Sequence, residues 1–113
     1  MANLTNYNIG GDVIKDDDTY RIIDNHQLSN LILSQTVLHA NRQTRGHRHA
    51  GQEEIYFFVS GTGQMIVGEE NSSAFEVSAG DVILIPDGAF HRVINNHEID
   101  LVFNCVFNGS RNH

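Results

Sequence analysis

The chain has 113 residues, of which 40% are hydrophobic and 19% are charged, and its formal net charge is −7. A chain of this length is expected to form one domain, and this composition is typical of a globular protein rather than a disordered one. The negative charge argues against nucleic acid as a partner, because such binding depends on Lys and Arg side chains that neutralise phosphates. No hydrophobic run approaches the roughly 20 residues that span a bilayer, so no membrane partner is expected.

Cys105 is the only cysteine, so no internal disulfide can form. The first residues lack the basic-then-hydrophobic pattern of a signal peptide. We therefore expect a reducing, cytoplasmic setting, in which Cys105 is a small buried hydrophobic residue.

The chain is expected to begin with an N-terminal arm over residues 1–29 that can include one edge strand, and its acidic run 16–18 is interpreted as a solvated turn. Residues 30–39 are rich in strand-forming side chains and lack helix caps, which predicts a strand. After them, residues 54–60 and 64–67 flank Gly61-Thr62-Gly63 and are predicted to pair as a hairpin. Four further short strands are predicted at residues 74–77, 81–85, 89–95 and 99–107.

About eight short strands separated by Gly, Pro and Asn turns, with no helix, predict an all-β, single-domain antiparallel β-barrel or jelly roll. Its bounds are expected at residues 30–107, followed by a C-terminal tail at 108–113. The runs 55–59 and 82–85 are hydrophobic on both faces, so something must cover the outer face. A second copy of the chain would do so, which predicts a homodimer.

A candidate metal site begins at His47 and His49, whose i, i+2 spacing places both imidazoles on one face of an extended segment. Either Glu53 or Glu54 could add a carboxylate, since the turn between them and the histidines breaks the alternation. A third imidazole, His91, lies in a strand-forming run. Three neutral imidazoles and one carboxylate suit a first-row transition metal.

These residues resemble the first motif of the cupin superfamily, which is Gly, five residues, His-x-His, three or four residues, Glu, six residues, Gly. His47, His49, Glu54 and Gly61 match this motif, and Glu54 rather than Glu53 has six residues before Gly61. The leading Gly falls at Asn41. Asn tolerates the left-handed backbone conformation better than most residues, so the turn is expected to persist.

The second cupin motif is Gly, five residues, Pro-x-Gly, two residues, His, three residues, Asn. It is matched throughout by Gly80, Pro86, Gly88, His91 and Asn95. The chain also resembles, more loosely, small single-domain cupins described as similar to sugar-phosphate isomerases. The resemblance spans about residues 30–107 and implies a cupin barrel with His47, His49, Glu54 and His91 as metal ligands.

Four such ligands would leave an octahedral ion two positions for a substrate that binds through oxygen atoms. Iron, manganese and nickel tolerate this arrangement, zinc more often prefers four ligands, and the residues do not decide among the four metals. Tyr56 follows Glu54 by two residues and should share its face. It could act as an acid or base, as its placement resembles the metal-adjacent tyrosine of cupin lyases that act on dimethylsulfoniopropionate, or it could be a core residue.

The other candidates each have an ordinary structural explanation. Arg42, Arg45 and Arg48 could form a basic rim for an anionic substrate, or they could make surface or dimer contacts. Arg48 lies between the two ligand histidines and must point away from the metal. Arg92, beside His91, has the same two explanations. Phe58, Phe103 and Phe107 could line the pocket or simply form the core. The remaining histidines have no ligand spacing and are expected to be non-ligands: His26, His39, His97 and His113.

Three functions remain open at this point. The first is a small metalloenzyme that isomerises, epimerises or eliminates from a compact polar substrate, such as a sugar derivative or a carboxylate, with the metal as Lewis acid. The second is an iron-dependent dioxygenase. The third is a non-catalytic module that binds a small ligand, because a fold alone does not determine function.

Overall fold

The computed structural model describes residues 8–109, which form ten strands and no helix. No helix in this part of the chain is long and hydrophobic enough to cross a membrane. The first seven residues of the predicted N-terminal arm, and the end of the predicted tail with His113, lie outside it. The strands are β1 (Asp12–Asp16), β2 (Tyr20–Asn25), β3 (Leu31–Leu38), β4 (Arg42–Gln43), β5 (Glu54–Ser60), β6 (Thr62–Gly68), β7 (Phe75–Ser78), β8 (Val82–Ile85), β9 (Phe90–Asn95) and β10 (Leu101–Asn108).

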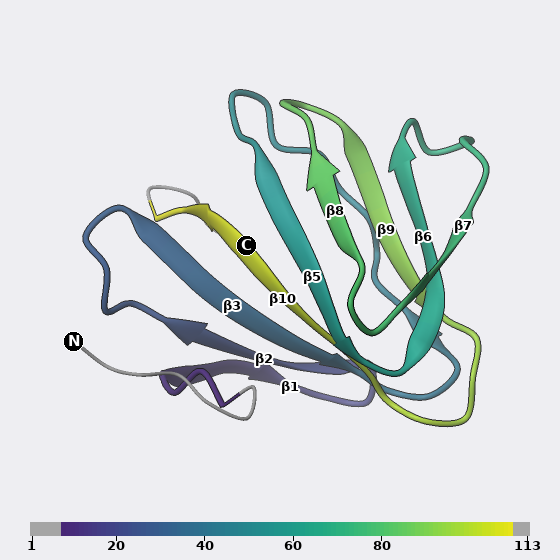
Figure 1. Cartoon of the computed structure of the whole chain (residues 1–113), viewed down its shortest axis with the longest axis horizontal. Helices are drawn as coiled ribbons and strands as arrows, with labels where there is room; N and C mark the ends of the chain where they lie inside the picture. Colours follow the sequence, from purple (N-terminus) through teal and green to yellow (C-terminus); the bar gives the residue numbers. More distant parts are fainter. Residues whose placement is uncertain (1–7, 110–113) are drawn as a thin grey trace.

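The strands form two antiparallel sheets that face each other (Figure 1). The large sheet has the order β1-β2-β3-β10-β5-β8, and the small sheet has the order β4-β9-β6-β7. In Figure 1 the two sheets diverge, with β1 to β3 at the lower left and β6, β7 and β9 at the right. The predicted all-β jelly roll is confirmed as a sandwich whose sheets do not close into a barrel.

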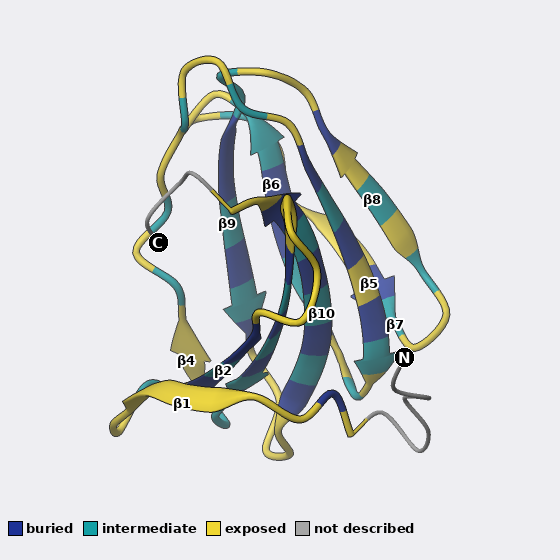
Figure 2. Cartoon of the chain, turned by 90° about the vertical axis from the view of Figure 1, so that its left-hand side faces the viewer, coloured by how far each residue is buried: buried dark blue, intermediate teal, exposed yellow. Residues whose placement is uncertain are grey.

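The core lies between the two sheets, and alternation along each strand selects the side chains that enter it. In β3 and β10 every second residue is buried, and the bands along β10 in Figure 2 show this alternation. Phe58 and Phe103 are almost fully buried and their ring centroids are 5.3 Å apart. Each buried aromatic side chain contributes about 2–3 kcal/mol through the surface it removes from water. Cys105 is buried, as expected, and forms no disulfide.

The predicted hairpin between residues 54–60 and 64–67 is wrong, because β5 lies in the large sheet and β6 in the small one. The chain crosses between sheets at Gly61, which has a φ of 88°. A Cβ atom there would lie 2.6 Å from the carbonyl oxygen of Asp100. Glycine is therefore required by both backbone conformation and close packing, and the turn redirects the chain instead of folding it back on β5.

The turn after β3 confirms the expectation for Asn41. Its φ is 59°, in the left-handed region that the family's glycine would adopt, and it is the one non-glycine residue with positive φ in the described part of the chain. The backbone N–H of Asn41 donates to the carbonyl of His97, 3.1 Å away. This turn directs the chain into β4 and the segment that carries His47 and His49.

Candidate metal centre

The four predicted ligands come from three separate parts of the sandwich. Glu54 is the first residue of β5 in the large sheet, and His91 is the second residue of β9 in the small sheet. His47 and His49 lie between β4 and β5. The backbones of His47 and His91 exchange two hydrogen bonds, with N···O distances of 3.1 and 3.0 Å, so the loop histidines are held against β9.

The side chains converge between the sheets. Ligand atoms of His47, His49 and Glu54 all lie within 4.8 Å of one another. The Nε2 atom of His91 lies 3.4 Å from Oε1 of Glu54, and its ring centroid is 4.5 Å from that of His47. Glu54 and His91 are buried while His47 is exposed, so the cluster has a buried side and an open side.

The buried imidazole of His91 provides a test of whether these residues suit a cation. Its Nδ1 atom is 3.2 Å from the carbonyl oxygen of Ala89, which can only accept, so Nδ1 carries the proton. In a neutral imidazole Nε2 then offers a lone pair toward the Glu54 carboxylate, and this buried atom makes no hydrogen bond to any described residue. Two acceptors 3.4 Å apart repel unless a cation offsets them, so the donor set fits a divalent metal ion.

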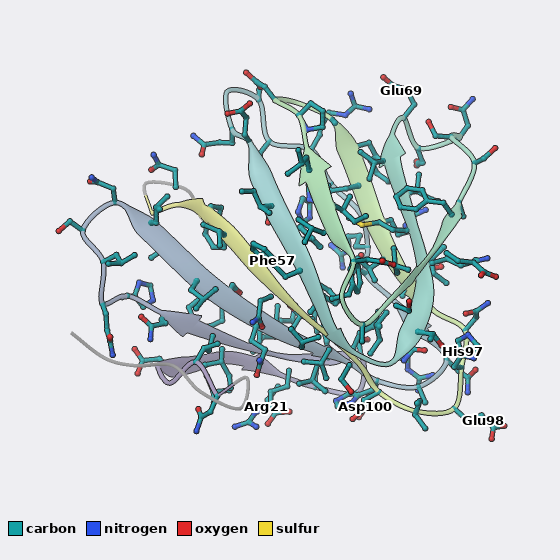
Figure 3. The ribbon with its side chains drawn as sticks, viewed as in Figure 1. Arg21, Phe57, Glu69, His97, Glu98 and Asp100 are labelled. Atoms are coloured by element: carbon teal, nitrogen blue, oxygen red, sulfur yellow. The ribbon has the colours of Figure 1, made fainter. Side chains whose placement is uncertain are left out.

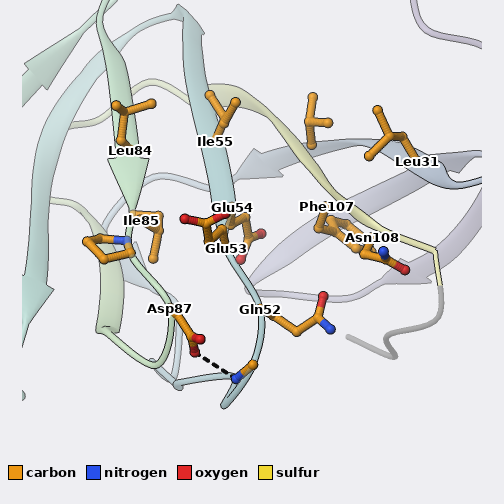
Figure 4. Close-up of a pocket in the computed structure, with 13 residues that line it drawn as sticks. Leu31, Gln52, Glu53, Glu54, Ile55, Leu84, Ile85, Asp87, Phe107 and Asn108 are labelled. Carbon is orange, nitrogen blue, oxygen red and sulfur yellow. Dashed lines mark hydrogen bonds between the residues drawn. The ribbon is translucent and has the colours of Figure 1, made fainter.

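A second turn holds the loop that carries His49. The backbone N–H of Gln52 donates to the carbonyl of His49, and that of Gly51 donates to Oδ1 of Asp87 at 2.6 Å (Figure 4). The hydrogen bond from Gly51 joins this loop to the turn that begins the strand of His91. Glu53 is exposed and is outside the group of close ligand atoms, so the structure brings Glu54 rather than Glu53 to the cluster.

A cavity of about 440 Å³ opens beside the cluster. His47, Glu54 and His91 form part of its wall, and Tyr56 and Phe103 form another part. The ring of Tyr56 is stacked on Phe103 at 5.3 Å and meets His91 edge-on at 5.7 Å. Tyr56 is therefore both packed like a core residue and placed on the cavity wall near the cluster.

Of the four predicted basic residues, the structure brings only Arg45 to the cavity wall. Arg48 points elsewhere and pairs with Glu69, with Nη2 and Oε2 2.9 Å apart. Arg92 donates through Nη2 and Nε to the backbone carbonyl of Arg45, at 2.6 and 3.3 Å. Arg42 is exposed in β4 and does not line the cavity.

The remaining predicted residues also divide into those at the cavity and those elsewhere. Phe103 lines the cavity, while Phe58 and Phe107 belong to the core. His26, His39 and His97 are not among the close ligand atoms. Sequence reasoning missed Lys15, which lines the cavity from β1. It is the only lysine in the chain, but no motif marks its position.

Comparison with known proteins places these features in a family. A 5-aminosalicylate 1,2-dioxygenase from a Comamonas species is 31% identical over 70 residues, or 62% of this chain and 18% of the dioxygenase. An oxalate-binding protein from Thermotoga maritima is 35% identical over 60 residues, or 53% of this chain and 47% of that protein. The chain spans between 18% and 56% of the length of the curated relatives it matches.

Structural similarity covers more of the chain. The crystal structure of a predicted oxalate decarboxylase from Thermotoga maritima covers 95% of this chain and 98% of its own, with a TM-score of 0.71 and 22% identity. At this identity the likeness shows the fold alone. The model of the cupin domain matches residues 35–107, which include both histidine motifs and all four predicted ligands, and the chain therefore belongs to the cupin family.

Proposed function

We propose that the protein is a small metalloenzyme that holds one divalent transition metal through His47, His49, Glu54 and His91. Its substrate would be a compact polar molecule, such as a sugar derivative or a carboxylate, and the reaction an isomerisation, an epimerisation or an elimination. One observation carries the proposal: ligand atoms of His47 and His49 gather around Glu54, His91 lies 3.4 Å from the same carboxylate, and a cavity of about 440 Å³ opens on this cluster. A cavity of this size suits a small ligand.

A bound metal would supply Lewis-acid stabilisation of negative charge that develops on a substrate oxygen. The protein orients the metal ligands and keeps water away from part of the cavity wall. The carbonyl of Ala89 fixes the tautomer of His91, and the stacked rings of Tyr56 and Phe103 exclude water from one side of the cavity. Iron, manganese, nickel and zinc are all compatible with this donor set.

We assign Tyr56 the role of acid or base. Its place on the cavity wall, with its ring 5.7 Å from that of His91, supports this role, because proton transfer requires a group within reach of the bound substrate. Tyr56→Phe removes the hydroxyl and keeps the stacking on Phe103, so turnover should fall by about 10²-fold or more while metal content is unchanged. Tyr20→Phe is the matched control, because Tyr20 lines the same cavity. Equal losses in both variants would contradict the assignment.

Two alternatives follow from the relatives. An iron-dependent dioxygenase is supported by the similarity to the 5-aminosalicylate enzyme, and a ligand-binding module by the similarity to the oxalate-binding protein. Protein loaded with each metal should be tested with small sugar derivatives and hydroxy acids, in air and under argon. Turnover that persists under argon supports the Lewis-acid enzyme, and strict dependence on oxygen supports the dioxygenase. Thermal stabilisation by a ligand without any product supports the binding module.

We further propose that the protein is a homodimer that uses the outer face of β3, β10, β5 and β8. On this face Leu31, Phe57, Val82 and Leu84 are exposed by 45%, 37%, 53% and 69%. A groove of about 790 Å³ runs along it beside Ile55 and Leu84 (Figure 4). None of the outward residues of these four strands is charged. Two chains of charge −7 repel each other, and the uncharged outward residues of these strands add nothing to that repulsion, whereas Glu53 and Asp87 also line the groove.

The cellular location is part of the same proposal. A buried Cys105 that forms no disulfide supports a reducing compartment such as the cytoplasm.

A further inference from the structure

The edge strand β1 contains an irregularity where it borders the cavity. Val13 pairs with Ile23 and Lys15 pairs with Ile22, so Ile14 is an extra residue in β1. Neighbouring residues of a regular strand face opposite sides, whereas a bulge can turn two consecutive side chains the same way. Both Ile14 and Lys15 line the cavity that holds the metal candidates.

Lys15 is exposed, and its charge acts on the Asp17 carboxylate of the same hairpin, whose pKa it helps to lower after the larger effect of two backbone hydrogen bonds. Its Nζ lies 5.1 Å from the ring centroid of Tyr20, another residue of the cavity wall. Lys15 forms no ion pair within the described residues. On the same hairpin Asp16 pairs with Arg21, and the Asp17 carboxylate accepts hydrogen bonds from backbone N–H groups.

Arg45 brings a second positive charge to this cavity from the segment after β4. Its backbone is held on two sides: the carbonyl of Arg45 accepts from Arg92, and the N–H of the preceding Thr44 donates to Val93 at 2.9 Å. Gly46 follows with a φ of 84°, and a Cβ there would come within 2.5 Å of Phe90. Arg45 is therefore presented from a fixed backbone, two residues before His47.

The cavity wall carries positive charge, whereas the net charge of the whole chain is negative. Lys15 and Arg45 are both in its wall, and Glu54 is the only carboxylate among the described residues that line it. Because Glu54 belongs to the candidate metal cluster, the remainder of the wall carries two positive charges in a chain of net charge −7. Such a local field attracts an anion.

We propose that Lys15 and Arg45 form an anion-binding subsite, and that the substrate is a short organic acid. Its carboxylate is bound by Lys15 and Arg45, and a second oxygen-bearing group faces the cluster of His47, Glu54 and His91. This deepens the proposed function and rests on it. The bulge in β1 lets Ile14 and Lys15 both line the cavity, because a regular strand would turn one of them away.

The experiment uses dicarboxylates from oxalate to glutarate as probes, with succinamide as the uncharged counterpart of succinate. Binding is measured by calorimetry to the manganese-loaded wild type and to Lys15→Gln and Arg45→Gln. The matched control is Arg21→Gln, which removes one positive charge from the same hairpin outside the cavity, where Arg21 points away from the molecule (Figure 3). Metal content is measured for every variant.

At least one dicarboxylate should bind the wild type, and succinamide should not bind. Lys15→Gln and Arg45→Gln should each weaken binding by about ten-fold or more, because each loses a charge-assisted hydrogen bond. Arg21→Gln should stay within about two-fold, because Arg21 lies outside the cavity and solvent screens its charge from a ligand bound there. Equal affinity of all four proteins, or no binding of any dicarboxylate, would overturn the subsite.

A second measurement separates this proposal from that of the metal centre. Lys15 is the only lysine, so acetylation of its side chain can be followed by peptide mass spectrometry in metal-loaded and in metal-free protein. The bound acid should slow acetylation of Lys15 several-fold, and succinamide should not. Protection without metal would retain the subsite even if the metal claim failed, whereas normal metal content without any protection would refute the subsite alone.

Discussion

Asn95, the last residue of the second histidine motif, is expected to stabilise the fold without binding metal. Its side chain is 1% exposed. Its two amide hydrogens are shared by the carbonyls of Leu38, His39 and Ile99, at 3.0, 3.2 and 2.8 Å, and its Oδ1 accepts from the N–H of His97 at 3.1 Å. One side chain thus joins the end of β9 to the end of β3 and to the start of β10.

Asn95→Ala would leave these backbone groups without their partner. A buried carbonyl that loses its donor costs about 1–3 kcal/mol, and each partly exposed one about 0.5–1.5 kcal/mol. The expected loss is therefore about 3 kcal/mol, a large part of the roughly 5–15 kcal/mol that stabilises a domain. Urea unfolding measures it, with the exposed neighbour Asn96→Ala as control, which should change stability by less than about 0.5 kcal/mol.

Two results would refute this role of Asn95. A loss below about 1 kcal/mol would mean that the four hydrogen bonds are not what holds the strand ends. Loss of metal from the folded variant, measured well below its unfolding midpoint, would mean that Asn95 supports the metal centre directly.

Two further predictions concern other parts of the fold. Leu84→Lys should convert the dimer to a monomer in analytical ultracentrifugation, whereas Ile99→Lys, at a residue 65% exposed on a distant loop, should not; a monomeric wild type would contradict the proposed interface. Hydrogen bonds from the backbone N–H groups of Tyr20 and Thr19 hold the pKa of Asp17 below its ordinary value of 3.8. The ionised Asp17 carboxylate therefore stabilises the folded state at pH values above 3.8, and this stabilisation is lost as the pH falls through the lowered pKa. An NMR titration of Asp17 should therefore give a midpoint below 3.8, and a midpoint at or above it would contradict this.

Much of the candidate site could be predicted from spacing, because the motif is a local property of the chain. His47 and His49 share a face in any extended segment, and Glu54 follows from its distance to Gly61. Asn41 was predictable for a similar reason, since its left-handed φ of 59° is a property of one residue. The structure adds that His91 comes from the opposite sheet and reaches Glu54.

The errors and omissions arise where tertiary packing decides. The sequence around Gly61 predicts a hairpin turn, because strand-forming runs lie on both sides of it. In the structure Gly61 packs against Asp100, and β6 pairs within the other sheet. Lys15 could not be assigned to the cavity because the bulge at Ile14 depends on the register with β2. Arg48 could be separated from the cavity in advance, because it lies between His47 and His49 and so faces away from the metal. Only the structure separates Arg45, which lines the cavity, from Arg42, which does not.

The most direct test of the central claim is elemental analysis of untagged protein purified without chelators. Wild type should hold about one equivalent of a first-row transition metal. His91→Ala should lose it because one of the four ligands is removed. His97→Ala, at an exposed histidine outside the cluster, should keep it. Metal retained in His91→Ala, or no metal in wild type even after anaerobic reloading, would contradict the proposed metal centre.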